Sequence, residues 1–235
     1  MIQRWLLTFL AGICIFAPEG LAQRVKSGSG TLADQIFLVS NYSDLNNYLE
    51  KEKLTAGELL DRNVRGFLLR LTVDTDSANV KMVVPSREVV PFSSFLVTLR
   101  NFLDNNPREV VTLFLDYNFP FFYLESELKN HHLYERIFVQ DADGNWPSSQ
   151  TMVSGGHQIV CFNMQRNQDS PPGFYYTWNH AAEPFFSTVI DPEFHGTFLR
   201  GNPGNPFMFF TGFNLPKDTT GLEIPFKKMH INENP

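Results

Sequence analysis

Short apolar runs alternate with amphipathic stretches along most of the chain. Residues 64–73 and 109–115 are almost continuously apolar, which is typical of strands buried on both faces. Phe95, Leu99, Phe102 and Leu103 share the spacing of one helix face. The string Thr55-Ala-Gly-Glu58 has the form of a capping box and predicts the start of another helix.

The same pattern predicts further elements on both sides of these runs. Strands are expected at residues 35–40, 79–84, 157–163, 175–178 and 206–211, and a helix at 125–138. Apolar strands that alternate with helices imply a parallel sheet covered by helices. No glycine-rich turn follows the first strand, so a doubly wound nucleotide-binding sheet is disfavoured. We predict an α/β fold, a distorted or incomplete TIM-type (β/α) barrel, imperfectly closed or lacking its last strand.

The N-terminus has the pattern of a secretory signal peptide. Arg4 precedes a short apolar run, and Gly20-Leu21-Ala22 places small residues before a cut at Gln23. The run is about a dozen residues, short of the roughly 20 that a membrane anchor needs. We expect a signal peptide at 1–22, a flexible lead-in at 23–34 and one barrel domain at 35–235, in a protein that is secreted, or periplasmic in a bacterium.

Composition narrows the classes of partner. The formal net charge is −6, which argues against nucleic-acid binding. Removal of the leader takes Cys14 and leaves Cys161, so no internal disulfide is expected and stability must come from the core. The composition gives no sign of a cofactor, and it leaves the oligomeric state open.

Several strings, in a fixed order, carry a resemblance to a known family. They are Asn63-Val64-Arg65-Gly66, the stretch 102–113 with its Asn106-Pro107-Arg108-Glu109, Trp146-Pro147 followed by Gln158-Ile159-Val160, and Tyr176-Thr177-Trp178-Asn179 with Glu183. Together, over roughly residues 35–215, they resemble the phosphatidylinositol-specific phospholipase C X-domain superfamily (PLC-like phosphodiesterases), in particular its small secreted plant and bacterial members. The resemblance implies a TIM-type barrel with an active site at the C-terminal ends of the strands.

The resemblance also implies a chemistry, phosphodiester cleavage by two histidines. One histidine acts as general base on the inositol 2-hydroxyl and the other as general acid on the leaving alcohol, while acidic residues orient them or bind a metal. Matching the strings puts Asn41 at the first histidine position, with Tyr42 beside it, and Val84 at the second. Arg70 occupies the acidic position of the second strand, and Asp116 retains the acid after a later strand.

These replacements predict a catalytically degenerate protein. No register shift restores the histidines, because the first histidine of the chain is His131. An amide does not take up a proton near neutral pH and valine has no proton to exchange, so more than the 10²–10⁴-fold rate contribution of one proton-transfer group should be lost. A guanidinium at Arg70 repels a cation instead of binding it, so no metal site is predicted.

The same residues suggest what the site binds. The planar guanidinium of Arg70 can hold a phosphate, and Lys81, Tyr42, Asp116 and Arg166 complete the set of candidate ligand-binding residues. The competing interpretation is structural: Arg70 and Asp116 neutralise each other, and Lys81 is an exposed strand residue. The expected ligand is a phosphoinositide or another phosphate-bearing molecule.

The aromatic string 119–123 leaves a peripheral membrane contact open beside simple core packing. Three functions therefore remain: a degenerate phosphodiesterase-fold protein that binds a ligand or partner, an active phosphodiesterase or lyase that uses Asp116, Arg70, Asn41 and Tyr42, and a structural protein without a small-molecule site.

Overall fold

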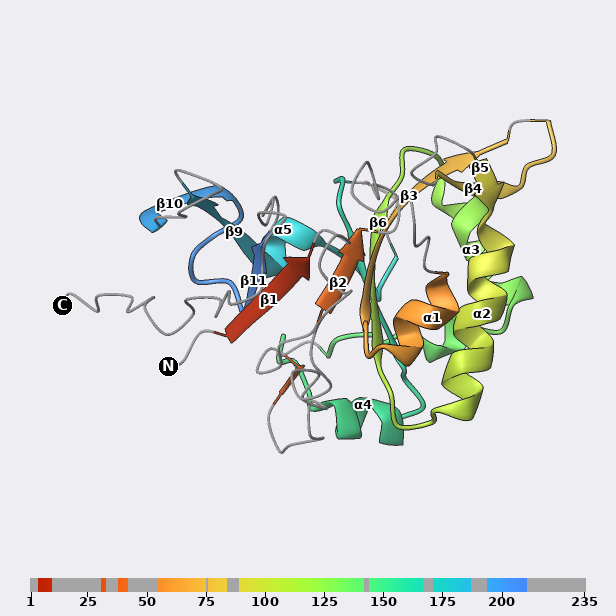
Figure 1. The fold of residues 1–235 in the computed structure, drawn as a ribbon, viewed down its shortest axis with the longest axis horizontal. Helices are drawn as coiled ribbons and strands as arrows, with labels where there is room; N and C mark the ends of the chain where they lie inside the picture. The colour runs from red at the N-terminus through yellow and green to blue at the C-terminus, as the bar shows by residue number, and fades with distance from the viewer. Residues whose placement is uncertain are drawn as a thin grey trace, which may run out of the picture.

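A mostly parallel sheet organises the protein in the computed structural model (Figure 1). The structure describes residues 4–9, 31–32, 38–41, 55–74, 76–83, 89–141, 144–166, 171–186 and 194–210. Parallel pairing joins, in order, β9 (Ala181–Phe186), β11 (Phe207–Phe210), β1 (Arg4–Phe9), β2 (Leu38–Asn41), β3 (Gly66–Val73), β6 (Val111–Asp116), β7 (Ile159–Asn163) and β8 (Phe174–Tyr176). This arrangement confirms the α/β fold with a barrel-like sheet.

The sheet is open at one seam. Its path runs from β10 (Phe194–Arg200), which pairs antiparallel with β9, to β8. In the described part of the chain no ladder joins β8 to β9; the short helix α5 (Thr177–His180) connects them instead. The Thr177 hydroxyl donates to the carbonyl oxygen of Asn163 at 2.7 Å, which ties α5 to the end of β7.

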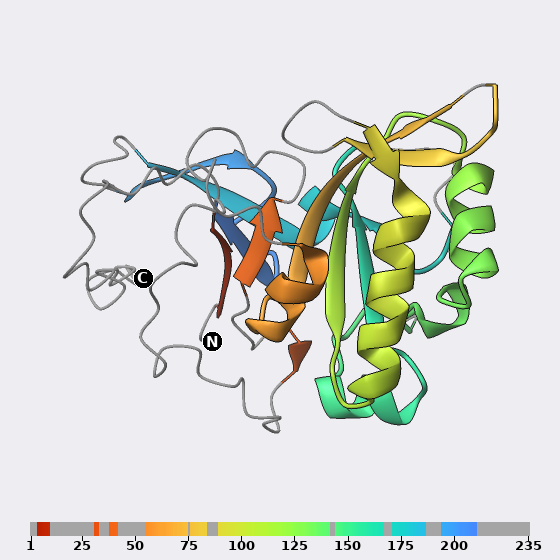
Figure 2. The same cartoon turned by 45° about the vertical axis from the view of Figure 1, so that its right-hand side comes forward.

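Three helices cover one side of the sheet. Helices α1 (Ala56–Asp61), α2 (Phe92–Asn105) and α3 (Phe121–Asn130) lie over the outer face of β3 and β6 (Figure 2). Along β3, Phe67, Leu69 and Leu71 belong to the cluster that packs under these helices, while Leu68 packs with the cluster inside the barrel. The alternation of side chains along a strand therefore puts Arg70 on the inner side, at the C-terminal end.

The start of α1 is confirmed at the predicted capping box, whereas the helix predicted from residue 125 begins earlier, at Phe121. Thr55 caps α1 with the reciprocal Thr55–Glu58 capping box. The predicted helix at 125–138 is instead α3 followed by a single 3-10 turn, η2 (Tyr134–Arg136), and helix α4 (Ser149–Ser154) precedes β7. Among the described helices, none combines the length and apolar character that crossing a bilayer requires.

The strand predicted at 79–84 exists, but it does not belong to the parallel set. It is β4 (Val80–Val83), which runs antiparallel to β3 and pairs with β5 (Val89–Pro91) in a side sheet above α2. A short hairpin connection after Val73 allows only antiparallel pairing, because a parallel return needs a crossover of a dozen or more residues.

Residues 4–9 have two competing descriptions. In the structure they form β1, inserted between β11 and β2, whereas the sequence predicts that they belong to a cleaved leader. The signal peptide remains a prediction, and residues 10–30, which include the predicted cleavage site, lie outside the described part of the chain.

Cys161 is expected to be chemically silent in the folded protein. Its side chain is fully buried in β7, and burial raises the pKa of the thiol far above its ordinary value, so the reactive thiolate is not formed. In the protein without residues 1–22, which carry Cys14, Ellman's reagent should therefore react only after guanidinium unfolding. Rapid reaction of the native protein at Cys161 would contradict the packing of β7.

Candidate functional site

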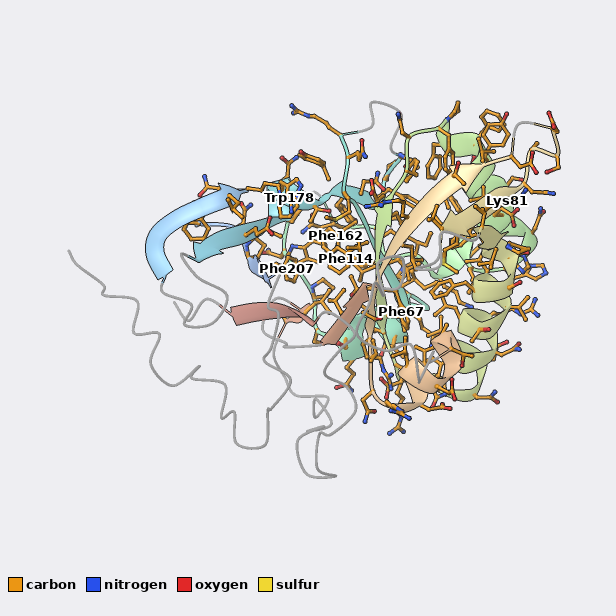
Figure 3. The ribbon with its side chains drawn as sticks, turned by 45° about the horizontal axis from the view of Figure 1, so that its top comes forward. Phe67, Lys81, Phe114, Phe162, Trp178 and Phe207 are labelled. Carbon is orange, nitrogen blue, oxygen red and sulfur yellow. The ribbon has the colours of Figure 1, made fainter. Side chains whose placement is uncertain are left out.

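The C-terminal ends of the parallel strands surround a pocket with an apolar floor. Inside the barrel, Phe114 and Phe162 stack at 5.3 Å between ring centroids, and Phe207 meets Phe162 edge to face at 5.7 Å. Figure 3 shows these three rings side by side, with Trp178 next to them and Phe67 apart on the helix side. These packed rings form the apolar floor of the pocket.

The pocket has a volume of about 680 Å³. Its lining consists of Leu68, Arg70, Asp116, Met164, Gln165, Arg166, Tyr176, Trp178, Arg200 and Gly201. Three of these described lining residues are arginines, one is a carboxylate and none is a histidine. Among the described lining residues, the wall therefore offers guanidinium donors and no imidazole for proton transfer.

Arg70 and Asp116 face each other across two neighbouring strands. They are direct partners in the parallel register of β3 and β6, and Arg70 Nε donates to Asp116 Oδ2 at 3.2 Å. Gln165, just after β7, donates from Nε2 to Asp116 Oδ1 at 2.8 Å. Both oxygens of Asp116 are thus engaged, while the Arg70 side chain remains 60% exposed.

This arrangement does not suit a metal ion. A cation would have to displace Gln165 or Arg70 from Asp116 and sit beside the Arg70 charge. Within the described residues, no group of three or more His, Cys, Asp or Glu side chains is placed to hold a metal. The metal that the resemblance implies therefore finds no matching ligand set at these residues.

The other two arginines each lie over an aromatic ring. The Arg166 guanidinium carbon is 5.9 Å from the centre of the Tyr176 ring, and that of Arg200 is 3.9 Å from the Trp178 ring. Arg200 also donates from Nε to Glu183 Oε2 at 2.6 Å. These contacts hold both cations on the pocket wall.

Comparison with known proteins decides the family. The sequence profile described as PI-PLC X 1 matches residues 46–206, which is more than half of the chain. The chain belongs to the PI-PLC X family. A comparison with curated protein sequences gives no match.

Among solved structures, this PI-PLC X protein is similar to the phosphatidylinositol-specific phospholipase C from Listeria monocytogenes. The identity is 16% and the TM-score 0.39, with 58% of this chain and 53% of the Listeria chain aligned. The chain thus covers about half of the length of that enzyme.

The structure brings together part of the set of residues that the sequence singles out in this PI-PLC X chain. Arg70, Asp116 and Arg166 line one pocket. The backbone of Asn41, at the end of β2, pairs with Leu68 of the pocket lining. Tyr42 and Val84 lie outside the described residues.

Lys81 lies elsewhere. Its ammonium pairs with Asp74 at 2.5 Å on the β3–β4 hairpin, and Figure 3 shows it on the far side of the molecule from Trp178. It does not line the pocket, which agrees with its interpretation as a strand residue at the surface and gives no support to a ligand role.

Sequence reasoning missed three contributors to the site. Gln165 follows β7 directly, a position that the strand prediction could have flagged. Trp178 is largely buried, yet it also lines the pocket. Arg200 has no motif around it, and only the fold brings it to the mouth.

His180, the last residue of α5, should give the fold a pH dependence. It packs edge to face against Trp146 at 5.5 Å and Tyr175 at 5.3 Å, and burial lowers its pKa below the ordinary value of 6.5. As the pH falls below about 6.5, the unfolded chain binds a proton at this position before the native chain does, so the free energy of unfolding should decrease. A His180→Phe variant should lose less stability than the parent between pH 7.5 and 5, measured by urea unfolding. An equal loss in both proteins would exclude His180 as the cause.

Proposed function

We propose that this chain is a secreted, catalytically degenerate member of the PI-PLC X family that binds a phosphate-bearing ligand at the barrel mouth. The observation that carries the proposal is the pocket itself, which has three arginines and no histidine among its described lining residues. Guanidinium groups match phosphate in charge and in planar geometry. Proton transfer, by contrast, needs a group that titrates near the working pH.

The loss of catalysis rests on the two positions where the family places its histidines. Matching assigns them to Asn41 and Val84. Asp116 alone does not replace them, because Arg70 and Gln165 hold both of its oxygens. Without an acid and a base on opposite sides of a phosphodiester, binding proceeds but the ester bond persists.

Arg70 and Arg166 are the proposed phosphate-binding residues. Arg70 is more than half exposed at the mouth, so its guanidinium can contact a ligand while Nε stays bonded to Asp116. Arg166, on the loop after β7, lies over Tyr176. Arg166 lines the same pocket as Arg70, so its guanidinium can add a second positive charge beside a bound phosphate.

Calorimetric titration with the soluble headgroup glycerophosphoinositol and with inositol 1-phosphate tests the proposal. Arg70→Gln should weaken binding by at least about tenfold, because a charge-assisted hydrogen bond contributes roughly 1.5–3 kcal/mol. Arg108→Gln is the matched control, since Arg108 is exposed just before β6, at the opposite end of the strand. An affinity that is the same in the parent protein and in Arg70→Gln would contradict the proposal.

A peripheral membrane contact has one supporting observation. Phe122, in the first turn of α3 just after the mouth loop, is 57% exposed, and aromatic side chains at such a rim partition into lipid interfaces. Cosedimentation with phosphatidylcholine vesicles that contain phosphatidylinositol should decrease in Phe122→Ser. Equal sedimentation of both proteins would exclude a membrane contact through Phe122 and would leave only the binding of a soluble ligand.

Secretion rests on residues 1–22. Mass spectrometry of the protein recovered from the culture medium, or from the periplasm of a bacterium, should give an N-terminus at Gln23. Because Cys14 would leave with the leader, the unfolded protein should then titrate as a single thiol. A protein that retains Arg4–Phe9 would instead keep β1 in the sheet and overturn this part of the proposal.

A further inference from the structure

Arg200 has a place in the pocket that the family motifs and the proposed function leave unexplained. It is the last residue of β10, a strand of the antiparallel hairpin with β9. In Figure 1, β10 lies at the left of the sheet, and β3, which carries Arg70, lies toward the right. Both arginines line the same pocket, so the mouth presents guanidinium groups from two separate walls.

The side chain of Arg200 is held in a defined position. Nε and Nη2 both lie 2.6 Å from Glu183 Oε2, and the guanidinium plane rests on Trp178. Glu183 is almost fully buried, with 3% of its side chain exposed, whereas 46% of the Arg200 side chain is exposed. One carboxylate oxygen thus fixes one edge of the guanidinium, which carries five N–H donors in all.

The backbone around Arg200 is equally constrained. Gly201 adopts φ +77°, and a Cβ atom there would lie 1.9 Å from the carbonyl oxygen of Ala181. Asn205 donates from Nδ2 to the carbonyl oxygens of Trp178 at 3.0 Å and Ala181 at 2.8 Å. The corner after β10 is therefore pressed against the end of α5, and this close approach sets Arg200 over Trp178.

We propose that Arg200 is a second anion-binding position, so that the pocket selects ligands with two separated phosphate groups over ligands with one. The inference rests on the proposed function, which supplies the first phosphate position at Arg70 and Arg166. A pocket of about 680 Å³ is large enough for a sugar- or polyol-sized ligand, whose typical pockets start near 300 Å³. A second phosphate on such a ligand would reach the wall that Arg200 forms.

The competing role for Arg200 is purely structural, as the counter-ion of the buried Glu183. Both roles place the guanidinium beside Glu183, but they predict different effects of Arg200 substitutions on ligand binding. A structural counter-ion changes stability and leaves the preference between ligands untouched. A second anion-binding position changes the preference for the ligand with two phosphate groups over the ligand with one.

The experiment compares fructose 1,6-bisphosphate with fructose 6-phosphate by calorimetry. The parent protein should bind the bisphosphate at least about tenfold more tightly, the effect of one additional charge-assisted contact. Glu183→Gln combined with Arg200→Gln replaces the ion pair by an uncharged amide pair, so no buried charge is left alone. In this double variant the preference should fall to within about twofold, because the second phosphate loses its contact.

A second variant covers the case in which the double substitution disturbs folding. Arg200→Lys keeps a positive charge opposite Glu183 but loses the planar fork, and it should lower the preference by at least threefold. Arg108→Gln serves again as the control and should leave the preference unchanged. A preference that survives in both Arg200 variants would overturn the inference.

The outcomes also separate this inference from the proposed function. If fructose 6-phosphate binds in an Arg70-dependent way and the second phosphate adds no affinity, the inference fails and the proposed function stands. If neither sugar phosphate nor inositol 1-phosphate binds, the proposed function fails and the inference fails with it.

Discussion

Gly201→Ala should destabilise the protein by roughly 2–5 kcal/mol, the sum of a left-handed backbone strain of about 1–2 kcal/mol and an overpacking cost of about 1–3 kcal/mol. The added Cβ would meet the Ala181 carbonyl oxygen at 1.9 Å and the Ala182 Cα at 2.9 Å. Backbone atoms cannot swing aside as a flexible side chain can, so the corner must move. Arg200 should move with it, and the preference for a bisphosphate should be lost as well.

Gly156→Ala is the matched control for this prediction. Gly156 also has a positive φ, +84°, but nothing lies within 4 Å of the position of its Cβ. Only the backbone strain should remain, about 1–2 kcal/mol in urea unfolding. Similar losses in the two variants would show that the corner does not press against α5.

Phe67→Ala should cost about 3–5 kcal/mol, the range for removing a large buried aromatic side chain. Phe67 lies on β3 with 0% of its surface exposed, and its ring meets Phe95 of α2 edge to face at 5.3 Å. The substitution would open a cavity between the sheet and the helix layer. Urea unfolding monitored by circular dichroism measures the loss.

Phe122→Ala is the control for the same chemical change at the surface. Phe122 is more than half exposed on α3, so its replacement should stay within about 0.5 kcal/mol of the parent. If Phe67→Ala were equally mild, the packing of α2 on the sheet would be wrong.

The parts of the fold that the sequence predicts are those with a strong local signal. Strand β6 is buried on both faces and reads as an apolar run, and the Thr55–Glu58 box marks the start of α1. The antiparallel course of β4 is different, because the same alternation fits a parallel or an antiparallel strand. Strand β9, with Glu183 and Pro184 in its middle, owes its conformation to its neighbours and carries no strand pattern.

In the candidate site too, local sequence patterns predict some contacts, and tertiary packing alone determines the others. Arg70 and Asp116 end neighbouring parallel strands, so their pairing could be predicted and is confirmed at 3.2 Å. Arg200 is remote from them in the chain, and its approach depends on the Gly201 corner and the Asn205 hydrogen bonds. No local pattern encodes such a tertiary contact. Lys81 is the opposite case. It lies near a family string in the sequence, but in the structure it pairs with Asp74 on the hairpin and does not line the pocket.

The central claim, that the mouth binds phosphate without cleaving it, has a direct test. Phosphatidylinositol vesicles are incubated with the parent protein and with Asp116→Ala, and the release of diacylglycerol and cyclic inositol phosphate is measured. We expect both proteins to give the rate of buffer alone, because matching to the family puts Asn41 and Val84, which exchange no proton near neutral pH, at the positions of its two histidines. Turnover by the parent protein that disappears in Asp116→Ala would contradict the account and establish an active phosphodiesterase.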